Sequence, residues 1–230
     1  MFGLGINNCR NLIIIEMKIL KKYSQVLKTI FIIILSFSFQ AGFIACTSNP
    51  KKDTSQKETK SKIEKAESSG TALEPDAFWD AALNGNLEVV SSMLKLGMDV
   101  NVADEDGRTA IMFAGFNGHT EVVKILIDRG AKIDAFDNSH RTALLFAATG
   151  PFPETVKLLL DNKSNPNVVD NGEHFSPLMH AAAEGNLEIV KILLEYGANM
   201  DLKDVDGDTA ETFARQKGHT AVADYLKSMK

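Results

Sequence analysis

Apolar residues recur in a regular pattern from about residue 71 to the end of the chain. Runs such as VVKILID (122–128) and EIVKILLE (188–195) space their apolar residues three or four positions apart, as in a half-buried α-helix. A shorter apolar segment precedes each run, as in TAIMFAGF (109–116) and SPLMHAAA (176–183). The pattern therefore predicts pairs of helices, a short one followed by a longer one.

The helix pairs repeat at a nearly constant period. A Thr or Ser opens each short helix, and the spacing is 33 residues from Thr109 to Thr142, 34 from Thr142 to Ser176 and 33 from Ser176 to Thr209. Asp76, 33 residues before Thr109, opens a similar segment. We expect five stacked units, because each can bury its apolar face only against a neighbour. They cover residues 71–103, 104–136, 137–169, 170–203 and 204–230.

Glycine and aspartate mark the turns of the repeated unit. Glycine follows the longer helix at Gly97, Gly130 and Gly197, where left-handed backbone ends a helix. Between units lie DEDG (104–107), DNGE (170–173) and DVDG (204–207), which favour tight turns.

Two departures from the period single out the third and fourth units. The third has GPFP at 150–153, and Lys163 stands where the other units have glycine. We expect Pro151 to shorten its first helix and Pro153 to begin its second, since proline is tolerated at the first helical position. One extra residue before Ser176 predicts a wider turn in the fourth unit.

These residues resemble the ankyrin repeat. GRTAIMFAGFNGHTEVVKILIDRGA (107–131) and SPLMHAAAEGNLEIVKILLEYGA (176–198) match its pattern over many positions, and the resemblance covers about residues 71–230. It implies an all-α solenoid of five stacked helix-turn-helix units joined by β-hairpin-like turns. It also implies a non-catalytic module that binds another protein.

A different pattern precedes the repeats. Lysines after Met17 are followed by an apolar run at 30–39, the layout of a secretory signal peptide. The run leads to FIAC (43–46), which resembles the bacterial lipobox, whose cysteine is lipidated. We expect a lipoprotein signal peptide at 17–45 and a lipid anchor on Cys46. Residues 1–16 then precede the true start, Met17.

This signal predicts a lipoprotein of the bacterial cell envelope that faces the periplasm or the exterior. Two alternatives stay open. The stretch 29–45 has 17 residues, at the short edge of a membrane-spanning helix, so it could be an uncleaved anchor. The other alternative is cleavage of the signal peptide without attachment of a lipid.

The segment after Cys46 predicts a disordered tether at 46–70. Residues 47–70 have six Lys against four acidic residues and Ile63 as their only large apolar residue, too little to form a core. Such a tether would hold a folded domain clear of the membrane.

Net charge, cysteine content and the motifs present limit the classes of ligand and site that the repeats could have. Residues 71–230 hold 14 Lys and Arg against 25 Asp and Glu, a formal charge of −11, which speaks against nucleic acid and favours a basic protein partner. The only cysteines are Cys9 and Cys46, so no disulfide framework is available. The aspartate-rich turns lack the glutamate that completes a calcium loop. We expect a monomer without cofactor, metal or catalytic motif.

The resemblance also implies where a partner binds, on a concave surface of turn tips and first helices. The candidate residues are Leu83, Arg108, Phe116, Asn117, Arg141, Phe175, His180 and Glu184. Phe116 and Phe175 are the candidate anchors, because large aromatic residues at positions usually open to water often mark interfaces. The alternative is that Phe175 folds back over the wide turn and Phe116 packs on Phe113. His119 and His219 are interpreted as structural.

Two other classes of function are alternatives to an interaction module. One is an immunity protein or inhibitor that neutralises an extracytoplasmic toxin or hydrolase. The other is an envelope enzyme built around His180 and Glu184, which are four residues apart on one short helix and could meet.

Overall fold

The structure, a computed structural model, describes residues 73–230. The expected upstream extension (1–16), signal peptide (17–45), lipidation site Cys46 and tether (46–70) lie outside the described residues. Within 73–230, none of the helices has the length and apolar character needed to cross a bilayer.

Ten α-helices in five pairs make up the regular structure of the described residues. The first helices of the pairs are α3 (Pro75–Leu83), α5 (Ala110–Phe116), α7 (Ala143–Ala147), α9 (Pro177–Ala183) and α11 (Ala210–Gln216). The second helices are α4 (Leu87–Lys95), α6 (Thr120–Asp128), α8 (Pro153–Asp161), α10 (Leu187–Glu195) and α12 (Thr220–Ser228). The predicted alternation of short and longer helices is confirmed for α5 to α12, whereas α3 is as long as α4.

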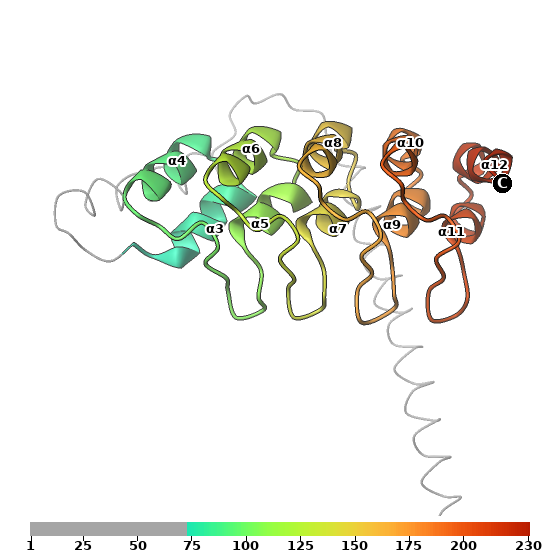
Figure 1. The fold of residues 1–230 in the computed structure, drawn as a ribbon, viewed down its shortest axis with the longest axis horizontal. Helices are drawn as coiled ribbons and strands as arrows, with labels where there is room; N and C mark the ends of the chain where they lie inside the picture. Colours follow the sequence, from blue (N-terminus) through green and yellow to red (C-terminus); the bar gives the residue numbers. More distant parts are fainter. Residues whose placement is uncertain (1–72) are drawn as a thin grey trace, which may run out of the picture. The chain divides into compact units, whose positions relative to one another are not determined.

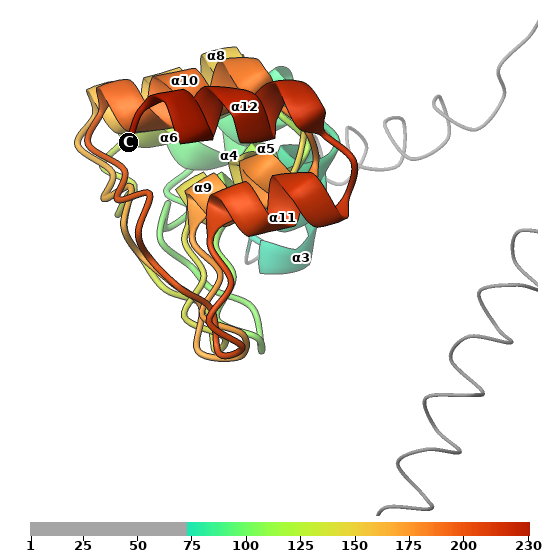
Figure 2. The same cartoon turned by 90° about the vertical axis from the view of Figure 1, so that its right-hand side faces the viewer.

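The helices form two layers that run along the stack (Figures 1 and 2). In the first layer α5 packs between α3 and α7, and α9 packs between α7 and α11. In the second layer α6 packs between α4 and α8, and α10 between α8 and α12. The predicted all-α solenoid is therefore confirmed.

Long loops between the units project from the first-helix layer on one side, as Figure 2 shows. We call these loops fingers. They are finger 1 (103–109), finger 2 (136–142), finger 3 (169–176) and finger 4 (203–209).

A continuous core follows from the period. One side chain occupies the same place in every second helix and is at most 1% exposed: Met93, Leu126, Leu159, Leu193 and Leu226. Alanine occupies a matching place in every first helix and is at most 4% exposed: Ala81, Ala114, Ala147, Ala181 and Ala214. The small alanines let the helices approach, and each buried Leu contributes about 1.5–3 kcal/mol.

The Thr or Ser before each short helix caps it in three units. The side-chain oxygens of Thr142, Ser176 and Thr209 accept hydrogen bonds from backbone amides in the first turn of α7, α9 and α11. Thr109 lies in the same place before α5, but its buried hydroxyl has no hydrogen-bond partner among the described residues. The shared sequence position thus gives a cap in α7, α9 and α11 and not in α5.

The third unit shows the predicted distortion. Helix α7 has 5 residues where α5 and α9 have 7, and Pro153 begins α8. Lys163 adopts the left-handed conformation, with φ of 72°, where Gly130 has 86° and Gly197 has 83°. Lys163 therefore adopts a backbone conformation for which the corresponding positions of the second and fourth units have glycine.

The wider turn of the fourth unit is also confirmed. The amide of Asp137 donates to the carbonyl of Arg141 across finger 2 (3.1 Å). In finger 3 the matching bond joins Asp170 to Phe175 (3.2 Å), so the loop closes over one more residue.

Candidate functional site

Each finger folds around one aspartate. The Oδ1 atom of Asp137 accepts hydrogen bonds from the amides of Ser139 (2.9 Å) and Arg141 (2.8 Å). Oδ1 of Asp104, Asp170 and Asp204 accepts from two or three amides of its own finger in the same way. These side-chain bonds fix the loop tips, in addition to the backbone bonds that close each finger, such as the isolated antiparallel bridge between Ala103 and Thr109 in finger 1.

Both candidate arginines are bound by these aspartates. Nε of Arg141 donates to Oδ2 of Asp137 (2.8 Å), and the guanidinium carbon lies 4.6 Å from the centroid of the Phe146 ring. Arg108 makes the same contacts with Asp104 (2.8 Å) and Phe113 (5.1 Å). The hydrogen bond to Asp104 raises the pKa of Arg108. Both guanidinium groups are thus already neutralised within the fold.

Asparagine side chains join neighbouring fingers. Nδ2 of Asn138 donates to the carbonyl of Glu105 (3.0 Å), and Nδ2 of Asn171 donates to the carbonyl of Asn138 (3.3 Å). The amide of Val205 donates to the carbonyl of Glu173 (3.1 Å). The four fingers therefore form one connected row.

Phe116 is the most open of the candidate anchors. It is 49% exposed at the end of α5, and its ring meets Phe146 edge-on with centroids 6.2 Å apart. The Phe116 ring thus packs against Phe146 of the next unit. Because Phe146 also carries the guanidinium of Arg141, these three side chains form one patch, which we call the Phe116 patch.

Leu83 and Asn117 are joined through the backbone. Nδ2 of Asn117 donates to the carbonyl of Leu83 (2.7 Å), and Nε2 of His119 lies 3.0 Å from the same oxygen. Asn117 is exposed and Leu83 half-buried. His119 thus has the structural contact that its position predicted.

Phe175 is half-buried and turned toward its own unit and the next. Its ring lies edge-on to His180 (5.4 Å between centroids) and to Phe213 of α11 (5.0 Å). The expectation of a freely exposed anchor at this position is therefore not met. The Phe175 ring packs between His180 of its own unit and Phe213 of the next unit.

His180 and Glu184 do not form an acid–base pair in the structure. Their hydrogen bond joins the Glu184 amide to the His180 carbonyl (3.0 Å), as in any helix. Burial lowers the pKa of His180, and the nearby charges of Asp170 and Glu184 oppose that shift. Glu184 itself is exposed. His180 therefore packs as an aromatic ring, in the place that Phe146 and Phe213 take in their units.

Several remaining histidines also have structural places. The ring of His219 lies against Gly185, as that of His119 lies against Gly85. His140 and His174 adopt the left-handed conformation in fingers 2 and 3 (φ of 60° and 61°), where fingers 1 and 4 have Gly107 and Gly207. Among residues 73–230 no group of three or more His, Cys, Asp or Glu side chains could hold a metal ion.

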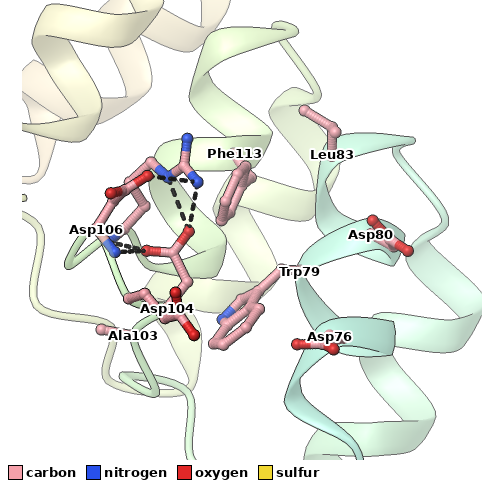
Figure 3. A pocket seen from close by; sticks show the side chains of 10 residues that line it. Asp76, Trp79, Asp80, Leu83, Ala103, Asp104, Asp106 and Phe113 are labelled. Carbon is pink, nitrogen blue, oxygen red and sulfur yellow. Dashed lines mark hydrogen bonds and ion pairs between the residues drawn. The ribbon is translucent and has the colours of Figure 1, made fainter.

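A feature that the sequence did not predict is a cavity of about 700 Å³ between α3, α5 and finger 1 (Figure 3). It is lined by Asp76, Trp79, Asp80, Leu83, Ala103, Asp104, Glu105, Asp106, Arg108 and Phe113. The signal that could have found the cavity is Asp80, because later units have Phe or His at its place.

Comparison with known proteins agrees with this architecture. The family profile described as "Ankyrin repeats (3 copies)" matches residues 78–170 and 147–230. The E3 ubiquitin-protein ligase hecd-1 of Caenorhabditis elegans is 45% identical over 60 residues, which are 25% of this chain and 2% of that protein. The similarity to hecd-1 is thus limited to a small part of a much longer protein. Because the profile covers nearly all of the described helix pairs, the chain belongs to the ankyrin-repeat family.

Proposed function

We propose that this chain is a membrane-anchored ankyrin-repeat lipoprotein that holds a protein partner at the bacterial cell envelope and catalyses no reaction. The repeats supply the interaction module, and Cys46 supplies the lipid anchor. The partner is basic, since residues 71–230 carry 14 basic against 25 acidic side chains. The module acts as a monomer.

The exposed Phe116 patch is the observation that supports binding most directly. A phenylalanine that is 49% exposed, next to a ring and a guanidinium held in place by Asp137, has the chemistry of an interface anchor. The surrounding surface is fixed by the row of fingers, so little ordering entropy opposes binding.

Capture of the partner from intact cells tests the binding surface. The full chain is crosslinked in cells, and proteins captured with the wild type are compared with those captured by Phe116→Ala. We expect Phe116→Ala to reduce capture about tenfold or more, as for an interface anchor. Leu96→Ala is the matched control, because Leu96 is 41% exposed at the end of α4 in the other layer. Equal capture by both variants contradicts the proposed surface.

The anchor has its own test. Mass spectrometry of the mature protein is expected to find Cys46 as the first residue, with lipid attached. Cys46→Ser is expected to move the protein out of the lipid-modified membrane pool. A mature chain that still contains residues 17–45 would support the uncleaved anchor instead.

A further inference from the structure

The cavity lies on the side of finger 1 that faces α3, as Figure 3 shows. Fingers 2, 3 and 4 each follow a neighbouring finger, to which the amides of Asn138, Asn171 and Val205 donate. Within residues 73–230 no such finger lies on the side of finger 1 that faces α3, and the open space of about 700 Å³ lies there.

Aromatic rings form part of the cavity wall. Nε1 of Trp79 donates a hydrogen bond to the carbonyl of Val102 (3.1 Å), which fixes the indole ring in place. Phe113 and Leu83 line the same space, as Figure 3 shows. The wall is therefore preformed and presents a π-face.

Carboxylates surround these rings. Arg108 is the only basic residue in the lining, and it is paired with Asp104 (2.7 Å) and Asp106 (3.0 Å). The carboxylates of Asp76, Asp80 and Glu105 line the cavity with no side-chain hydrogen bond or ion pair to another described residue. The cavity thus has negative charge that the fold does not neutralise.

Twice in this chain, an aromatic ring and a carboxylate together bind an arginine of the chain itself. Arg108 lies over Phe113 and Arg141 over Phe146, and a finger aspartate holds each guanidinium. In the first unit the place of these arginines is taken by Pro75, and Asp80 takes the place of the phenylalanine. The first unit therefore provides carboxylates beside rings without an arginine of its own.

We propose that this cavity receives an arginine side chain from the protein partner, an inference that rests on the proposed function. The guanidinium stacks on Trp79 and is bound by Asp80 and Asp76. A planar guanidinium suits this wall better than an ammonium group, because it can stack on an aromatic ring and bind carboxylates along its edge. Anionic ligands are excluded by the unpaired carboxylates.

Binding in the cavity can be followed by the fluorescence of Trp79, because it is the only tryptophan in the chain. The full-length protein in neutral detergent is titrated with the peptide acetyl-Gly-Arg-Gly-amide, and tryptophan emission is recorded. We expect a saturable change that is lost when citrulline, which is uncharged, replaces the arginine. The Asp76→Asn, Asp80→Asn double variant is expected to bind about tenfold more weakly or not at all.

Two control variants separate this inference from the proposed function. Asp224→Asn removes an exposed carboxylate from α12 and is expected to leave the titration unchanged. Phe116→Ala is expected to reduce partner capture and to bind the arginine peptide like the wild type. If Phe116→Ala reduces capture but the wild type shows no saturable response to the peptide, the proposed function stands and the arginine site is wrong.

Other outcomes also overturn the arginine site. Equal binding of the arginine and citrulline peptides contradicts recognition of a guanidinium. If the peptide binds only after the six Lys of residues 47–70 are changed to Gln, the occupant is the chain's own segment and not a partner. If dilution of the protein alone changes the emission, the occupant is a second copy.

Discussion

The ring of Phe175 meets the imidazole of His180 edge-on, with centroids 5.4 Å apart and planes at 82° to each other. Phe213 lies against the same phenylalanine from the next unit, 5.0 Å away. The candidate anchor Phe175 thus packs between two units, and the candidate binding residue His180 packs against it.

Acidification is expected to destabilise the repeats through His180. Burial lowers the pKa of this histidine in the folded state, so the unfolded state binds the proton first as the pH falls below the ordinary value of about 6.5. The free energy of unfolding therefore decreases from that pH downward until the folded-state pKa is passed. His180→Phe is expected to reduce this slope, measured by urea unfolding between about pH 7.5 and pH 5. Parallel pH curves for wild type and variant would contradict the assignment.

The two threonines before α5 and α7 are expected to respond differently to the same change. Thr142 accepts a hydrogen bond from the amide of Leu145 (3.3 Å), so Thr142→Val is expected to cost about 1 kcal/mol of unfolding free energy. The buried hydroxyl of Thr109 has no partner, so Thr109→Val is expected to be neutral or slightly stabilising. Urea unfolding midpoints measure the difference, and equal losses would show that Thr109 is also a cap.

Exchanging the residues after α6 and α8 tests the cost of left-handed backbone. Lys163→Gly is expected to raise the free energy of unfolding by about 1 kcal/mol, because the lysine has φ of 72°. Gly130→Lys is expected to lower it by a similar amount, because Gly130 has φ of 86° and there is open space for a side chain. Thermal unfolding of both variants checks the pair, and shifts in the same direction would refute this account.

Replacing a finger aspartate by alanine is expected to cost more unfolding free energy when the aspartate is more buried and binds more groups. The Asp137 side chain is 1% exposed and binds two amides and Arg141, so Asp137→Ala is expected to cost about 3 kcal/mol. The Oδ1 atom of Asp204 binds two amides and no arginine, so Asp204→Ala is expected to cost about 1–2 kcal/mol. Chemical denaturation compares the two, and a larger loss for Asp204→Ala would contradict the ranking.

The helix pairs could be predicted from the sequence because the apolar residues that they bury recur at a regular spacing. Leu126 and Leu159 are buried for the same reason one unit apart, so spacing alone places them. The shortened α7, the start of α8 at Pro153 and the wider finger 3 also followed, since proline and an inserted residue act locally.

Contacts between units could not be read from spacing. Whether the Phe116 ring meets Phe113 or Phe146 depends on side-chain rotamers and on the tilt between neighbouring helices. The cavity next to Trp79 is lined by residues of α3, finger 1 and α5 together, so no single motif marks it. The left-handed backbone of His140 and His174 was not predicted either. These residues occupy the finger position that Gly107 and Gly207 have in fingers 1 and 4, and the loop fold sets their backbone conformation.

The row of fingers also bears on how the repeats fold. Side-chain hydrogen bonds between units join neighbouring units, as Lys157 of α8 does with the hydroxyl of Tyr196, 39 residues away. Closing such short loops costs little entropy, so folding can start at one pair of units and spread to the next. Each repeat can therefore complete its fold once the next repeat is available to pack against it, without waiting for the C-terminus, whether the chain is being synthesised or exported.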